Sequence, residues 1–233
     1  MGERQVSPPS PTVDEDTQME LASQIRELIL TGEYVPNQRL VEADISEEFG
    51  YSRPAVREAL RELVGEGLVE RVANRGARVR AIGFEEAVEI AEARLVLESL
   101  CAGKAALAVT DDEIVKLRHI GDEMRTAVEV GDRDTYAGRN RELHNLVHEI
   151  SGQRTAVGLI RRLRGQNVRQ QFKLAQKPGR ADVSLHEHLA IIDAIASRDR
   201  EAAQDAMRMH LESVIRAMHE VHAESAARGR RTA

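Results

Sequence analysis

The sequence predicts a mainly α-helical protein, with an N-terminal winged helix-turn-helix domain followed by an all-helical bundle domain. Two observations predict this fold class. Residues 38–80 read as two short helices joined by a tight turn and followed by a two-stranded wing. From Phe84 onward, apolar residues recur only at helical spacing. The 233 residues are enough for two ordinary domains, and a hydrophobic content of 42% is sufficient for real cores.

The domain boundaries follow from composition. Prolines among Ser, Thr and acidic residues predict a disordered tail over 1–16. We expect the winged domain over 17–82, where Gly83 marks a boundary, and the helical domain over 83–225. A second disordered tail is expected over 226–233.

The first expected helix covers 17–31, with its apolar residues on one face. The second and third helices cover 41–49 and 53–66. Gly50 tolerates the left-handed backbone needed where the second helix stops. Ser52 can cap the third helix, and Pro54 fits its first turn.

The third helix has one apolar face and a row of arginines on the other. Arg53, Arg57 and Arg61 follow one another four residues apart. This arrangement is what a helix needs to read the major groove, so the pattern predicts DNA binding.

A wing is expected after this helix, with strands over 68–72 and 77–80 and a turn at Asn74–Gly76. The whole chain has a net charge of −6, but residues 53–80 hold seven arginines and four glutamates, a local charge of +3. Because this patch is modest, we expect affinity for DNA to need more than one copy of the domain.

The second domain is expected to be a bundle with short connections. Its expected helices cover 84–109, 111–130, 133–151, 155–176, 184–197 and 199–225.

Polar residues occupy positions that are normally apolar in the core of a helical bundle. Asn140 and His144 share the apolar face of helix 133–151, and His188 and His210 lie in the apolar stripes of the last two helices. A single inward histidine is more often a hydrogen-bonded core residue. Three on separate helices, with an amide oxygen, also suit a divalent transition metal. Spacing alone leaves both interpretations open.

Arg94 lies in the apolar stripe of helix 84–109. It either pairs with a buried acid such as Glu98 or binds the carboxylate of a ligand. We place His148 off the inward face, and we expect Glu149 and Glu187 to point away from it, which leaves no general base beside the histidines.

With these residues identified, the chain resembles GntR-family transcription regulators of the FadR subfamily, with an FCD-type effector domain. The stretch GYSRPAVREALRELVGEGLVE resembles the recognition region of that family, and EHLAIIDAIASRDREAAQDAMRMHL resembles its last two helices. Metal-binding members use an Asp-x3-His pair and two further histidines. The matching positions are Asn140, His144, His188 and His210.

The resemblance implies that Arg39, Arg53 and Arg57 contact DNA and that Arg75 and Gly76 reach the minor groove from the wing. We also expect Ser52 at this interface. The family Thr-Pro is replaced by Pro54-Ala55.

In the effector domain, the resemblance implies one divalent transition metal ion per subunit, Zn, Ni or Mn. Asn140 replaces the usual Asp, which leaves the site one negative charge short. The effector-binding positions would be Arg94, Asn140, His144, His188 and His210. The alternative is a metal-free acid pocket formed by Arg94 and the histidines.

The preferred interpretation is a ligand-responsive repressor. A homodimer would bind a palindromic operator in double-stranded DNA, and a small organic acid would modulate that binding. The alternatives are a helical metal-dependent hydrolase with an appended DNA-binding domain, and a constitutive architectural protein. With no membrane-spanning run, no signal-peptide pattern and one cysteine, Cys101, we expect a cytoplasmic protein without an intramolecular disulfide.

Overall fold

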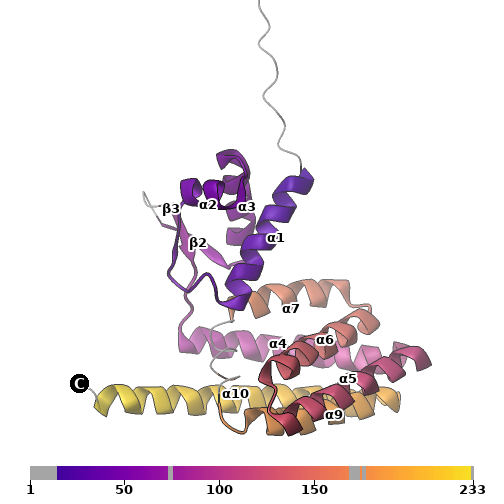
Figure 1. The fold of residues 1–233 in the computed structure, drawn as a ribbon. Coiled ribbons are helices and arrows are strands. Elements are labelled where there is room, and N and C mark those ends of the chain that lie inside the picture. Colours follow the sequence, from indigo (N-terminus) through magenta and orange to yellow (C-terminus); the bar gives the residue numbers. More distant parts are fainter. Residues whose placement is uncertain (1–14, 73–75, 168–173, 175–176, 232–233) are drawn as a thin grey trace, which may run out of the picture. The chain divides into compact units, whose positions relative to one another are not determined.

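The computed structural model describes residues 15–72, 76–167, 174 and 177–231 (Figure 1). The chain divides into two compact units, unit 1 over Met1–Ala81 and unit 2 over Ile82–Ala233. Unit 1 holds, in chain order, α1 (Glu15–Thr31), β1 (Arg39–Leu40), α2 (Glu42–Phe49), α3 (Arg53–Gly65), β2 (Val69–Val72) and β3 (Gly76–Val79).

The turn between α2 and α3 has the predicted chemistry. Gly50 adopts φ 74°, a left-handed conformation, and its backbone N–H donates to the carbonyl of Ser46. The Ser52 hydroxyl then accepts from the backbone N–H of Ala55 at 3.4 Å, which caps α3. These two residues fix the angle at which α3 leaves the turn.

Unit 1 is closed by apolar packing and by one arginine. Leu21, Ile25 and Leu63 are fully buried, so α1 and α3 share a core. The Arg26 guanidinium binds Glu66 Oε1 at 2.7 Å and Glu62 Oε1 at 2.9 Å. α1 is thereby tied to the C-terminal half of α3.

The wing is part of a three-stranded antiparallel sheet with the order β1-β3-β2. Arg39 pairs with Arg78 and Val69 pairs with Val79. β1 has only two residues, too few for an alternating pattern, and the sequence did not predict it. Of the expected wing turn, Asn74 and Arg75 lie outside the described residues.

Unit 2 is helical throughout its described part. Its elements are α4 (Phe84–Ala108), α5 (Asp111–Val130), α6 (Arg133–Ser151), α7 (Arg154–Gln166), α9 (Arg180–Ala196) and α10 (Arg200–Arg231).

The described helices of unit 2 pack around a main apolar core and two smaller apolar clusters. α4 runs alongside α10 and also packs against α6 and α7, while α5 packs against α6 and α9 (Figure 1). Two of these contacts are very close. A Cβ added at Gly103 of α4 would lie 2.5 Å from the Gln204 side chain, and one added at Gly121 of α5 would lie 3.0 Å from Ile192. Glycine therefore sets the distance between these helices.

Several boundaries differ from those expected. α1 begins at Glu15, inside the segment 1–16 assigned to a tail. α9 begins at Arg180 rather than 184, because the Arg180 guanidinium binds Ser213 and Glu187 and holds an extra first turn. α10 continues to Arg231 through a run rich in Ala and Arg, which are good helix formers.

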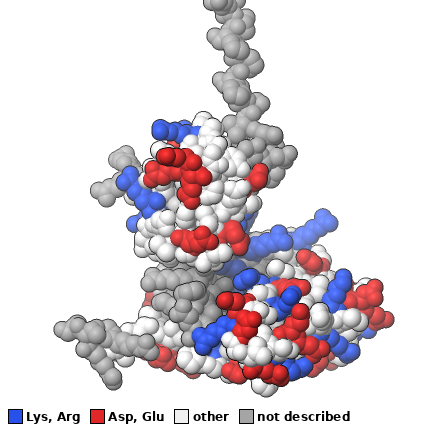
Figure 2. All heavy atoms as spheres, viewed as in Figure 1, with Lys and Arg blue, Asp and Glu red and all other residues white. Residues whose placement is uncertain are grey.

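The remaining helix of the expected set, 155–176, is represented by α7, which ends at Gln166. Residues 168–173 and 175–176 lie outside the described part. Within that part, no helix has both the length and the apolar character needed to cross a bilayer. On the face seen in Figure 2, lysines and arginines are mixed with carboxylates over unit 2, whereas carboxylates gather in patches on unit 1.

Candidate functional site

The first candidate surface is a hollow of about 260 Å³ in unit 1. It lies between β1, the start of α2, α3 and the wing, and three of its lining residues are Arg39, Arg57 and Arg71. All three side chains are exposed. Gly76, at φ 84°, also lines the hollow and leaves its mouth free of a side chain. Cations gathered on a concave surface beside an exposed helix suit a polyanion such as DNA.

Arg57 is held in place by a carboxylate. Its Nε and Nη2 donate to Glu42 Oε1 at 3.1 Å and to Oε2 at 2.8 Å. The hydrogen bond from Arg57 lowers the pKa of Glu42, and the charges of Arg71 and Arg53 lower it further. Arg57 therefore presents its guanidinium in a fixed orientation, while Glu42 competes with any external acceptor.

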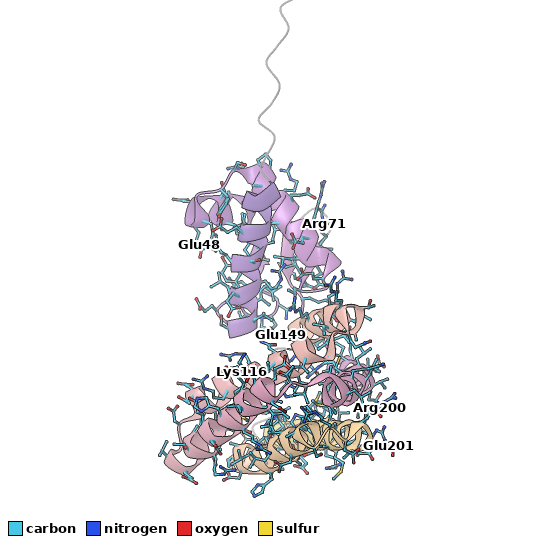
Figure 3. The ribbon with its side chains drawn as sticks, turned by 90° about the vertical axis from the view of Figure 1, so that its right-hand side faces the viewer. Glu48, Arg71, Lys116, Glu149, Arg200 and Glu201 are labelled. Carbon is cyan, nitrogen blue, oxygen red and sulfur yellow. The ribbon has the colours of Figure 1, made fainter. Side chains whose placement is uncertain are left out.

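The other expected DNA-contacting residues occupy separate places. Arg53 is exposed at the first position of α3, and Ser52 precedes it as the cap. Arg61 pairs with Glu58 on its own helix at 2.9 Å. Arg71, on β2, was not singled out from the sequence (Figure 3). The alternating pattern of strand β2 places Arg71 on the exposed face, and this pattern could have identified it.

The second candidate site is a cage of three histidines in unit 2. His144 on α6, His188 on α9 and His210 on α10 are all buried, and each offers one ring nitrogen within 4.8 Å of the others. Ring centroids are 4.5 Å apart for His188 and His210, and 5.5 Å apart for His144 and His210. The structure thus brings together histidines from three helices, as the helical spacing indicated.

Each imidazole is contacted from outside the cage at its Nδ1 atom. The Tyr136 hydroxyl lies 3.1 Å from Nδ1 of His188, and Glu187 Oε2 lies 2.8 Å from Nδ1 of His210. Glu98 Oε2 approaches Nδ1 of His144 at 3.1 Å, close but not aligned as a hydrogen bond. Outer partners of this kind orient metal-binding histidines and leave Nε2 for the ligand.

Besides Nδ1 of His144, which faces Glu98, two polar atoms of the cage histidines and their neighbour Asn140 are buried without a hydrogen-bond partner. They are Nε2 of His188 and Oδ1 of Asn140. Asn140 precedes His144 by one helical turn on α6, so its amide lies on the same face. Buried donors and acceptors are normally paired, which makes these two atoms candidates for contact with a ligand.

Two of the cage histidines favour the neutral form of imidazole. Burial lowers the pKa of His144 to about 3, although Glu98 opposes the shift. Burial also lowers the pKa of His188, and the neighbouring charge on His210 would lower it further. Neutral histidine is the form that binds metal ions, so His144 and His188 need not lose protons before a cation binds.

Arg94 forms an ion pair. Its Nε and Nη2 both donate to Oε1 of Glu98, at 2.9 and 2.7 Å, and both side chains are buried. Of the two alternatives left open by the sequence, the structure therefore has the internal pair. Burial would raise the pKa of Glu98, but the Arg94 charge and the contacts of His144 and His148 hold it well below its usual value.

Two expectations about this site were wrong. His148 is buried, with Nε2 lying 3.8 Å from Glu98 Oε2, rather than on the surface. Glu187 points toward the cage and contacts His210, and its pKa is lowered because that contact and Ser213 and Arg180 outweigh the effect of burial. Both residues acquire partners from neighbouring helices, which periodicity within one helix does not reveal.

The comparisons with known proteins account for both units. The model of the bacterial regulatory proteins of the gntR family matches residues 17–79, and the FCD domain model matches residues 89–213. The chain belongs to the GntR family and carries an FCD domain. This GntR-family membership agrees with the helix-turn-helix and the helical unit described above.

Named relatives of this GntR-family chain are transcription regulators. The HTH-type transcriptional repressor RspR of Escherichia coli K12 is 26% identical over 190 residues, covering 82% of this chain and 83% of the relative. A protein of Paenarthrobacter nicotinovorans named "Probable D-xylose utilization operon transcriptional repressor" is 28% identical over 199 residues, covering 84% and 87%. Among solved structures, E. coli McbR/YncC shares the fold with a TM-score of 0.76 at 19% identity, over 91% of this chain and 100% of that one.

The GntR-family chain is therefore a DNA-binding transcription regulator with an effector-binding helical domain. The family matches and the names of the relatives support this function over the helical hydrolase considered from the sequence.

Proposed function

We propose that this regulator is a homodimeric repressor that a small carboxylic acid releases from a palindromic operator. In this proposal the acid binds in unit 2 beside one divalent transition metal ion per subunit, Zn, Ni or Mn. The observation that carries the proposal is the cage, in which His144, His188 and His210 offer ring nitrogens within 4.8 Å of one another.

The residues present fit a metal ion. Nε2 of His188 and Oδ1 of Asn140 are both buried and lack a partner, which is unfavourable unless something else contacts them. Imidazole nitrogens with one amide oxygen form a donor set that suits a borderline transition metal. The outer contacts of Tyr136, Glu98 and Glu187 hold the three rings in place.

The charge of the cage favours an anionic effector. Asn140 is neutral where a carboxylate is expected in the family, and burial lowers the pKa values of His144 and His188, which favours their neutral forms. A metal bound here would keep its full positive charge and attract a carboxylate oxygen. A neutral cage without metal attracts anions much less, so the metal and the acid should bind cooperatively.

On the DNA side, we assign contacts to Arg39, Arg53 and Arg57 from the hollow and from α3. Ser52 and the wing residues Arg75 and Gly76 complete the proposed interface. Arg75 lies outside the described residues, and its place in the interface rests on the resemblance alone. Two copies of this surface on one dimer would contact two half-sites of the operator.

The test combines native mass spectrometry, elemental analysis and gel shifts. The purified chain should have a dimeric mass and carry about one transition metal ion per subunit. Malate should weaken operator binding only while the metal is present. A chain that takes up none of Zn, Ni or Mn would rule out the metal-assisted form.

A matched pair of variants separates the cage from general effects on α9. His188→Ala should reduce metal uptake. His186→Ala, two residues away, should not, because the His186 side chain is exposed and its Nδ1 lies 2.8 Å from the carbonyl oxygen of Asp182. Equal metal content in the two variants would count against the cage.

A further inference from the structure

The effector's carboxylate needs a cation, and Arg94 is already bound. Its Nε and Nη2 both donate to Glu98, which is 0% exposed. An acid that took Arg94 away would leave the Glu98 carboxylate buried and uncompensated, which is strongly unfavourable. The cation that receives an effector is therefore expected elsewhere around the cage.

α7 brings a second arginine, Arg164, to the same region. At one end of the α4–α7 contact, the buried Ile160 packs in a cluster with Cys101 of α4. At the other end, Asn167 Nδ2 donates to the carbonyl of Ala87 at 3.2 Å. Arg164 lies between these contact points and follows Ile160 by four residues, so it shares the stripe of α7 that faces α4.

The side chain of Arg164 is partly buried and is unpaired among the described residues. Within the described part of the chain it has no hydrogen bond and no ion pair, unlike Arg94. Burial lowers the pKa of Arg164, while the charge of Glu98 opposes that shift. A partly buried guanidinium without a partner is unusual, because arginine has five donors to satisfy.

Arg164 is also within electrostatic reach of the cage. The two α4–α7 contacts lie on either side of the part of α4 that carries Glu98, and Glu98 Oε2 lies 3.1 Å from Nδ1 of His144. An anion beside the histidines would therefore interact favourably with the guanidinium of Arg164.

We propose that Arg164 is the residue that binds the carboxylate of the effector, while Arg94 serves to compensate Glu98. The ligand class is a small carboxylic acid with one carboxylate on Arg164 and an oxygen directed at the histidine cage. This inference rests on the proposed function, since it concerns the acid expected there.

The test uses acetate, glycolate, malate and citrate as probes, with acetamide as the neutral counterpart of acetate. Binding to the metal-loaded full chain is followed by calorimetry and by the shift in melting temperature. Arg164→Gln should weaken the best-bound of these acids about tenfold or more, because a charge-assisted contact is lost. Arg164→Lys should restore part of the affinity, since it keeps the charge but not the two-pronged geometry.

Arg161→Gln is the matched control, because it removes the same charge from an exposed position on the same helix. It should bind the acid as the wild type does. Metal content should be unchanged in both variants. Arg164→Gln should melt close to the wild type without acid, because among the described residues it removes no hydrogen bond and no ion pair.

The outcomes separate this inference from the function on which it rests. If the wild type binds one of the acids and Arg164→Gln binds it equally well, the role of Arg164 is wrong and the proposed function stands. If Arg94→Gln abolishes acid binding and Arg164→Gln does not, Arg94 is the anchor. If none of the four acids binds the metal-loaded wild type, the carboxylate effector and the role of Arg164 fall together.

Discussion

At the scale of single residues, the Arg57–Glu42 pair decides how α3 meets DNA. The guanidinium is already oriented by two hydrogen bonds, so little side-chain freedom remains to be lost on binding. We predict that Arg57→Ala weakens operator binding by about 1–3 kcal/mol per half-site, the size of a lost bidentate base contact. Gel-shift titration at one fixed salt concentration measures this loss.

The control for this prediction is Arg61→Ala. Arg61 lies one turn further along α3 and is paired with Glu58. The Arg61→Ala substitution removes the same charge. It should cause only the smaller, sequence-independent loss of DNA affinity that is expected of a phosphate contact. Equal losses on specific and random DNA for Arg57→Ala would show that Arg57 does not read bases.

Asn140 occupies the position where the resemblance to metal-binding relatives implies an aspartate. We predict that Asn140→Asp tightens metal binding by roughly tenfold or more, since changes in outer partners alone have effects of that size. The same change should weaken an anionic effector, because the added charge lies beside its site. Metal titration calorimetry and acid titrations on the two proteins measure the pair of effects.

The opposite signs make this prediction discriminating. An Asn140 with a purely structural role would lower the melting temperature on becoming Asp and leave metal content unchanged. Uptake of no divalent ion by either protein would leave only a metal-free acid pocket.

The cage also shows which properties of a single residue can be predicted from the sequence. His144, His188 and His210 were identified because each lies in the apolar stripe of its helix. Glu187 and His148 were misplaced, because their partners come from α10 and α4. Which face of a helix a residue occupies can be read from spacing, whereas its partner depends on how helices are arranged.

At the scale of elements, boundaries with clear capping chemistry were predictable. The start of α5 was placed correctly because Thr110 and Glu113 form a capping box. The strand β1 was not predicted, since two residues carry no period and the strand exists only because β3 pairs with it. Likewise, the first turn of α9 depends on contacts of Arg180 with Glu187 and Ser213.

The contact between α5 and α9 provides a test at this scale. A Cβ at Gly121 would lie 3.0 Å from Ile192 Cδ1 and 3.1 Å from Leu189 Cδ2. We predict that Gly121→Val lowers the free energy of unfolding by about 1–3 kcal/mol, because extra atoms must displace packed neighbours. It should also reduce metal uptake, since α9 carries His188.

Gly158 is the matched control. It is an exposed helical glycine on α7, and a Cβ there meets nothing within 4 Å. Gly158→Val should change stability by no more than about 0.5 kcal/mol. Urea denaturation of both variants compares them, and equal losses would mean that the α5–α9 contact is not close-packed.

At the scale of the whole molecule, the buried histidines make stability depend on pH. The pKa of His144 falls from 6.5 unfolded to about 3 folded, so between these values the unfolded chain binds a proton that the folded chain does not. Stability should therefore decrease as the pH falls below 6.5, by up to about 1.4 kcal/mol per pH unit for each such histidine. The lowered pKa of Glu98 acts in the same direction below its unfolded value.

Urea denaturation of the metal-free chain between pH 7 and pH 5 measures this slope. His144→Gln should flatten it, whereas His119→Gln, which changes an exposed histidine, should not. A slope unchanged by His144→Gln would mean that this imidazole is charged in the folded chain.

The last prediction concerns the number of DNA-binding units that act together. Residues 53–80 contribute a net charge of only +3, so one copy can displace few counterions from DNA. We predict that the chain binds its operator as a dimer formed through unit 2, and that a fragment beginning at Phe84 is also dimeric. Light scattering at micromolar concentration should give twice the subunit mass for both.

The logarithm of the binding constant should then fall with the logarithm of salt concentration about twice as steeply for the full chain as for unit 1 alone, because two copies release two sets of counterions. A monomeric mass for the fragment would move the dimer contact out of unit 2, and equal salt slopes would mean that one unit binds DNA at a time.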